Sequence, residues 1–296
     1  MRTFLSAFAI LASAALAAPA AAQNKQDDQD RDEIVVEGSR DRERQIEQFV
    51  DALTPARNRG QLSRFEWSVC PAAMGLSEAQ NAAVAARMLR VAKAASIPTG
   101  EANCRPNVFV VVTREKQAFI EQLRKQYPAD FADMAPQEIR SLASSAGPVA
   151  AWHVKGLLNA DGLEVGKNAR TGYYVNQATD MPSRITNTTR PHFVASIVVL
   201  ELNAVGGLTT KQLADYAAMR AFSQADPSKL TNAAAPTILT MLDAPADAPV
   251  PITLTQWDLS FLRGLYSSSD NLYASQQRGE IERAMGKDLE KAQSKE

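Results

Sequence analysis

The sequence predicts an α+β protein with a mixed central sheet flanked by helices and a mainly helical C-terminal part. Three apolar runs have the length of buried strands, and they lie at residues 107–113, 149–154 and 192–202. Segments with apolar residues at helical spacing lie between and after these runs. Because strands and helices alternate early and helices dominate later, we expect a single α+β domain over residues 46–272.

Before the first long strand, the sequence predicts two helices and a short strand. Apolar residues recur on one stripe of residues 40–53, and a Thr-Pro pair ends this helix. Residues 62–67 form a candidate short strand. Ser77 is a suitable N-cap for the second helix, which we expect over residues 78–95.

After the first long strand, the chain continues through shorter elements and becomes mainly helical. In chain order we expect a helix at 114–126, shorter helical segments at 130–142, an irregular insertion at 159–180, a helix at 212–222 and another at 255–266. Residues 273–296 are polar and predict an exposed helical tail.

The N-terminus has the features of a cleavable signal peptide over residues 1–22. Arg2 precedes a short, alanine-rich apolar stretch at residues 4–16, and the alanines that follow match the small-residue rule for cleavage. Cleavage there leaves Gln23 as the mature start. An N-terminal membrane anchor is the disfavoured alternative, because the apolar stretch is shorter than a transmembrane helix requires. The sequence therefore predicts a periplasmic or secreted protein with no integral membrane segment after signal removal.

Residues 23–45 are polar and charged, which predicts a disordered leader. One apolar island interrupts it, where Ile34, Val35 and Val36 lie between two glutamates. This stretch resembles the TonB box near the mature N-terminus of many outer-membrane receptors of Gram-negative bacteria. The resemblance implies a Gram-negative envelope location and a strand that can add to the sheet of a partner. The alternatives are an edge strand in this protein's own sheet and a chance apolar run.

Charge and cysteine content narrow the classes of partner and cofactor. Lys and Arg number 32 against 33 Asp and Glu, and the net charge of −1 argues against a nucleic-acid partner. The two cysteines, Cys70 and Cys104, are expected to pair as a disulfide in an oxidising compartment. A cysteine metal site is disfavoured, since two distant thiols without nearby histidines lack ligand spacing. No cofactor is expected.

Two short motifs resemble a family of secreted proteobacterial proteins of unknown function, whose layout is similar to zincin-type zinc metalloproteases. The first is a strand–Gly-Gly–helix unit that ends at residues 213–220, and the second lies at residues 254–266. The resemblance covers about residues 60–270. It implies a zincin-like mixed sheet with a helix beside it that corresponds to the zinc-binding helix.

A zincin helix needs two histidines one turn apart to bind zinc and a glutamate to polarise the bound water. The resemblance puts Ala214 and Ala218 at the ligand positions and Asp215 at the position of the base, next to Tyr216. Methyl groups cannot bind zinc. The resemblance therefore implies a degenerate cleft at these four residues, without a metal site.

Three classes of function follow from these observations. The leading interpretation is a non-enzymatic, envelope-associated protein that binds an unknown protein or envelope ligand. The first alternative is a peptidase-like hydrolase with an unrecognised site that uses Asp215, His153 or His192. The second alternative is an accessory protein that engages TonB-type machinery through residues 33–38.

Overall fold

The computed structural model describes residues 40–55, 60–168, 170–176, 187–230, 235–245 and 249–294. The chain divides into two compact units, Met1–Arg42 and Glu43–Glu296. The expected signal peptide, the partner-binding strand at Ile34, Val35 and Val36, and the cleavage site lie outside the described residues. The fold below is that of the second unit, which begins within a helix over residues 40–53.

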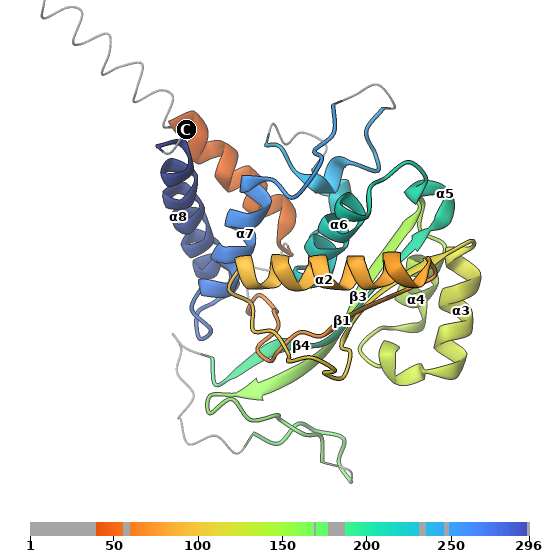
Figure 1. Cartoon of the computed structure of the whole chain (residues 1–296). Coiled ribbons are helices and arrows are strands. Elements are labelled where there is room, and N and C mark those ends of the chain that lie inside the picture. The colour runs from red at the N-terminus through yellow and green to blue at the C-terminus, as the bar shows by residue number, and fades with distance from the viewer. Residues whose placement is uncertain are drawn as a thin grey trace, which may run out of the picture. The chain divides into compact units, whose positions relative to one another are not determined.

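The centre of the fold is a mixed four-stranded sheet, as the sequence predicts. Its strands are β1 (Pro71–Met74), β2 (Val108–Thr113), β3 (Val149–Asn159) and β4 (Thr189–Glu201), in the spatial order β1-β2-β4-β3 (Figure 1). β1, β2 and β4 run parallel, whereas β3 pairs antiparallel with β4. β3 is therefore one edge of the sheet and β1 is the other.

The short strand expected at residues 62–67 is wrong in position, because β1 begins at Pro71 and pairs with β2 from Val108 onward. The backbone of Cys70 holds this register: its N–H donates to Asn107 Oδ1 at 2.8 Å, and its carbonyl accepts from the Asn107 amide at 3.1 Å. The predicted Cys70–Cys104 disulfide is confirmed and lies beside this contact. Within residues 62–67, the backbone of Arg64 forms an isolated parallel bridge with His192 and no strand.

Helices cover both faces of the sheet (Figure 1), and membership of the two core clusters shows that successive side chains of β2 alternate between these faces. Val110 and Val112 belong to the larger core cluster, which includes α2 (Glu78–Ala94) and α6 (Thr210–Phe222). Val111 belongs to the smaller cluster under α3 (Lys116–Gln126) and α4 (Pro136–Ala143). The shorter helices are η1 (Pro128–Phe131), α5 (Leu202–Val205), η2 (Pro227–Lys229) and η3 (Ile238–Thr240).

A tight turn connects β1 to α2. Gly75 has φ +94°, and a Cβ at this position would lie 1.9 Å from the Val112 carbonyl oxygen. Only glycine therefore allows the chain to pass this close to β2. Ser77 then caps α2 as predicted, and its side chain forms a reciprocal capping box with Gln80.

The C-terminal helices α7 (Gln256–Ser267) and α8 (Ala274–Gln293) pack side by side (Figure 1). The expectation of an exposed polar tail is wrong for one face of α8, because Ile281, Met285 and Leu289 are buried. These apolar residues recur every four positions, so they form a narrow stripe within a sequence that is polar on average. α8 is therefore part of the core.

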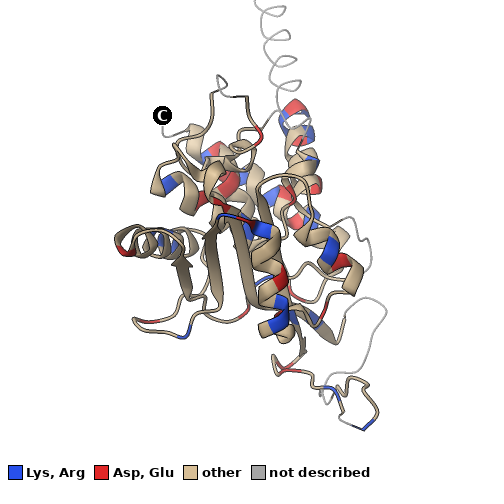
Figure 2. Cartoon of the chain, turned by 90° about the vertical axis from the view of Figure 1, so that its right-hand side faces the viewer, with Lys and Arg blue, Asp and Glu red and all other residues tan. Residues whose placement is uncertain are grey.

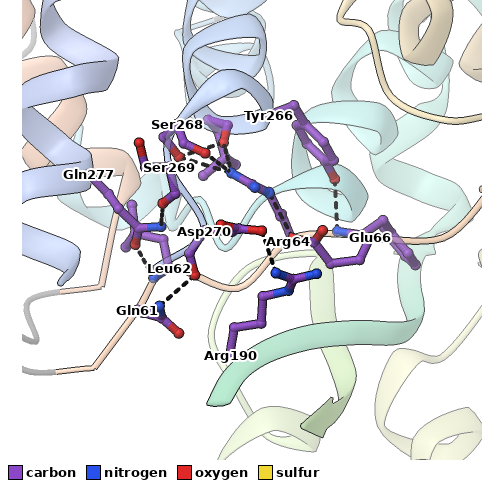
Figure 3. Close-up of polar contacts among 12 residues, drawn as sticks. Gln61, Leu62, Arg64, Glu66, Arg190, Tyr266, Ser268, Ser269, Asp270 and Gln277 are labelled. Atoms are coloured by element: carbon purple, nitrogen blue, oxygen red, sulfur yellow. Dashed lines mark hydrogen bonds and ion pairs between the residues drawn. The ribbon is translucent and has the colours of Figure 1, made fainter. Parts of the chain in front are cut away.

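Hydrogen bonds and an ion pair connect the turn between α7 and α8 to the rest of the fold (Figure 3). The buried Arg64 donates through Nη1 to the carbonyl oxygens of Leu265 at 2.9 Å and Ser268 at 2.6 Å. Arg190 of β4 forms an ion pair with Asp270 in the same turn. The charge-assisted bonds of Arg64 connect chain segments about 200 residues apart in sequence, and the ion pair of Arg190 connects segments 80 residues apart.

Candidate functional site

The helix that the resemblance identifies, α6, is buried on nearly all sides. Thr209 caps it through a reciprocal capping box with Gln212. The expectation that Ala214, Asp215 and Ala218 line a cleft is wrong, because all three have no exposed surface. Small alanine side chains let α6 pack closely in the larger core cluster.

Both carboxylate oxygens of Asp215 accept hydrogen bonds from other parts of the fold. Its Oδ1 accepts from Arg87 Nε at 2.6 Å, and its Oδ2 accepts from Arg87 Nη2 at 3.0 Å. Oδ2 also accepts from Thr253 Oγ1 at 2.7 Å and from the Leu254 amide at 2.8 Å. A carboxylate saturated in this way joins α2, α6 and the chain before α7. It does not face a substrate, which removes it from the candidates for a catalytic base.

Tyr216 and Arg220, one turn apart on α6, are the side chains that reach a groove from this helix. The Arg220 Nη1 lies 3.3 Å from the Tyr216 hydroxyl oxygen and donates to it. Burial raises the pKa of Tyr216, while the neighbouring Arg220 charge opposes that shift. The phenol is therefore neutral at physiological pH.

The groove has a volume of about 1200 Å³ and runs along β3. One wall comes from α4 and the chain before it, the opposite wall comes from α6 and the loop after it, and β3 lies between them. Figure 2 views the side of the protein that carries α3 and α4, where acidic and basic residues are interspersed. Prominent lining residues are Met134, Leu142, Trp152, His153, Tyr216 and Arg220.

The backbone of β3 presents unpaired hydrogen-bonding groups to this groove. The Glu201 amide donates to the Pro148 carbonyl, which sets the phase of the antiparallel ladder with β4. In such a ladder only every second residue bonds to the partner strand, so Val149, Ala151 and His153 direct their N–H and C=O groups outward. Among the described residues, no strand pairs with this edge between 149 and 153.

Both ends of this open edge are defined. On the C-terminal side, the Lys155 amide donates to Asp133 Oδ2 at 3.0 Å, and the Leu157 carbonyl accepts from the Val165 amide at 2.7 Å. On the N-terminal side, Pro148 lies in the bend directly before the strand. The open edge is therefore about five residues or roughly 17 Å long, at about 3.4 Å per residue.

His153 lies at the centre of the groove but is not placed as a catalytic base. Its Nε2 lies 3.0 Å from the Ala221 carbonyl oxygen, which can only accept, so the hydrogen is assigned to Nε2. Burial lowers the pKa of His153 to about 3, and the charges of Lys155 and Arg220 act in the same direction. The ring stacks on Phe193 and stays neutral, which fits a structural role in the groove wall.

Ser145 also lines the groove, and its partner is Lys116. Lys116 Nζ lies 2.7 Å from both the Ser145 and Gly147 carbonyl oxygens and 3.0 Å from Ser145 Oγ. The serine hydroxyl donates in turn to the Leu142 carbonyl at 2.8 Å. Burial lowers the pKa of Lys116, while the charge of Glu201 opposes that shift. The hydroxyl hydrogen of Ser145 is therefore directed to Leu142 and not to Lys116, and the lysine holds the turn before β3.

His192, the other histidine considered for catalysis, is fully buried outside the groove lining. Its ring packs against Trp67 with centroids 4.6 Å apart, and neither ring nitrogen has a hydrogen-bond partner among the residues that the structure describes. Burial lowers the pKa of His192, while the charge of Glu164 opposes that shift. The structure therefore does not bring His153, His192 and Asp215 together as a site.

Sequence reasoning missed the groove because it predicts a strand at residues 149–154 without giving that strand a place in the order of the sheet. The structure makes it an edge strand, and the features that could have suggested this are Pro148 directly before it and Lys155 within it. Proline and lysine are common at sheet edges, where one side of the strand is not paired.

The fold and this site define an α+β protein with a groove along an open strand edge. No family model matches the chain, and no curated protein or solved structure matches it either. Within the described part of the chain, no group of three or more His, Cys, Asp or Glu side chains could hold a metal ion. In the same part, no helix has the length and apolar character needed to cross a bilayer.

Proposed function

We propose that the protein is an exported, non-enzymatic binding protein that holds an extended peptide segment in the groove along β3. The observation that carries the proposal is the open edge at Val149, Ala151 and His153, which lies between the two walls of the groove. An extended peptide can add to such an edge as a further strand, with main-chain hydrogen bonds for affinity and wall contacts for specificity. The catalytic groups considered above are engaged in structural contacts.

The proposal includes a degenerate zincin-like scaffold. The support is that α6 follows the parallel strand β4 and packs beside α2 on one face of a mixed sheet. The two α6 side chains that face the groove at one-turn spacing are Tyr216 and Arg220, whereas Ala214 and Ala218, which the resemblance puts at the positions of the imidazoles, are buried. A phenol and a guanidinium serve as hydrogen-bond donors toward a ligand and are poor ligands for zinc.

The disulfide supports an oxidising location such as the Gram-negative periplasm or the exterior. We therefore propose an envelope protein whose peptide ligand is encountered after export. Engagement of TonB-type machinery through residues 33–38 rests on the sequence resemblance alone.

The decisive experiment changes the backbone donor at the centre of the open edge. Ala151→Pro removes the outward N–H at a position where an edge strand tolerates proline. Ala151→Val is the matched control, because it adds similar bulk and keeps the N–H. Binding of both variants and the wild-type protein to an immobilised library of Val- and Thr-rich pentapeptides is measured, with thermal unfolding as a check of the fold.

We expect wild-type protein and Ala151→Val to bind a common subset of these peptides, and Ala151→Pro to bind it at least about tenfold more weakly. Equal binding by a correctly folded Ala151→Pro would show that the strand edge is not the site. Absence of peptide binding by wild-type protein would overturn the proposal as a whole.

A further inference from the structure

The groove contains a positive charge with no acidic partner. Among the described residues, the buried Arg220 Nε has no hydrogen-bond partner, and Nη1 donates to the neutral Tyr216 hydroxyl. Within the residues that the structure describes, no carboxylate lies within ion-pair distance of this guanidinium. A buried guanidinium donor without an acceptor is costly, so an acceptor supplied by a ligand would be favourable.

The acidic residues around the groove do not fill this role. Three of the four that line it accept backbone hydrogen bonds: Glu138 and Asp226 from their own helix or loop ends, and Asp133 from the Lys155 amide of β3. The fourth, Asp243, is exposed and is not paired with Arg220. Its charge nevertheless acts on the neighbouring Tyr216. An incoming ligand therefore meets Arg220, which has no acidic partner in the described part of the chain, together with Lys155 and further negative charge near it.

We propose that Arg220 is a carboxylate anchor, and that the groove selects an extended peptide carrying a single carboxylate at the position facing α6. The inference rests on the proposed peptide-binding function and adds the chemical class of the ligand. Guanidinium and carboxylate groups match in geometry and can form two parallel charge-assisted bonds. The Tyr216 hydroxyl, 3.3 Å from Arg220 Nη1, is placed to support the same group. Asp243 and the other acids disfavour a run of acidic residues.

The carboxylate has two possible sources, a Glu or Asp side chain within the peptide and the α-carboxylate at its C-terminus. A set of pentapeptides separates them. The peptides differ only at the central residue, Glu or Gln, and at the C-terminus, free acid or amide. Their affinities are measured by calorimetry against wild-type protein, Arg220→Gln and Ala151→Pro. Arg90→Gln is the control, because it removes an exposed charge from α2 outside the groove.

For wild-type protein and Arg90→Gln, we expect one carboxylate source to improve the dissociation constant about tenfold over the neutral peptide. Arg220→Gln is expected to lose that preference and to keep the affinity for the neutral peptide. If Arg220→Gln does not fold, Arg220→Lys takes its place and is expected to retain a weaker preference for the carboxylate. The source that gives the preference identifies the ligand class.

The two proposals fail in different ways. If Arg220→Gln retains the full preference for the carboxylate, or wild-type protein shows no preference, the anchor is overturned and edge binding stands. If Ala151→Pro binds every peptide as wild-type protein does, edge binding is overturned. Tighter binding of a peptide with several glutamates than of one with a single glutamate would also contradict the anchor as described.

Discussion

Arg87 of α2 and Asp215 of α6 form a bidentate ion pair, in which Nε donates to Oδ1 at 2.6 Å and Nη2 donates to Oδ2 at 3.0 Å. The carboxylate has no exposed surface, whereas about a quarter of the arginine side chain is exposed. This ion pair therefore connects two helices that pack in the larger core cluster. The residue that the resemblance put at a catalytic position is thus a determinant of stability.

Replacing Asp215 by Ala is expected to destabilise the protein by roughly 3–5 kcal/mol, because the charge of Arg87 and two further donors lose their acceptor. Urea unfolding of purified protein measures this change. Asp288→Ala is the comparison, since its pair with Arg263 is partly exposed and should contribute about 0–1 kcal/mol. Equal losses for the two variants would show that burial of Asp215 does not matter.

Ala218→Leu is expected to cost roughly 1–3 kcal/mol by overpacking the core around α6. The position has no exposed surface and belongs to the larger core cluster. Ala82→Leu on the exposed side of α2 is the matched control and should change stability by less than about 0.5 kcal/mol. Thermal or urea unfolding tests both, and a stable Ala218→Leu protein would mean that this helix face is loosely packed.

Loss of the Cys70–Cys104 disulfide is expected to destabilise the protein by about 3–4 kcal/mol, since the bond closes a loop with a sequence separation of 34. The Cys70→Ala/Cys104→Ala protein and reduced wild-type protein should unfold at similarly lower urea concentrations. Thiol labelling of denatured, non-reduced protein should find no free cysteine. Two labelled thiols in exported protein would contradict the bond.

Stability should fall as pH drops from about 6.5 toward 3, and His153 should contribute to this loss. Its pKa is about 3 in the folded protein against an ordinary value of 6.5. Between these two pH values His153 is therefore protonated in the unfolded chain and neutral in the folded protein. One such group contributes a slope of up to about 1.4 kcal/mol per pH unit. Above pH 6.5 the histidine is neutral in both states and the slope disappears.

His153→Gln tests this, because an amide can still donate to the Ala221 carbonyl but does not titrate. Free energies of unfolding are measured between pH 4 and pH 8 for both proteins. We expect their difference to change with pH below about 6.5 and to be constant above it. Parallel curves across the whole range would show that His153 titrates normally in the folded protein.

Local chemistry explains what the sequence alone could predict. The β2 run is apolar and β-branched, Ser77 and Thr209 carry hydroxyls at the right distance from a glutamine, and two cysteines have only each other as partners. Each of these features depends on residues close together or on composition. They were sufficient for the α+β class, the mixed sheet, the helix starts and the disulfide.

The tertiary structure alone decided which side chains face the groove. Long polar side chains in α6 are spread around its circumference at Lys211, Gln212, Asp215 and Arg220, so its sequence contains no clear apolar stripe that fixes its rotation about its own axis. Packing against α2 and the sheet set that rotation, which turned Tyr216 and Arg220 toward the groove and buried Ala214 and Ala218. In the same way, β3 became an open edge because the order of strands depends on contacts between distant parts of the chain, which local periodicity does not encode.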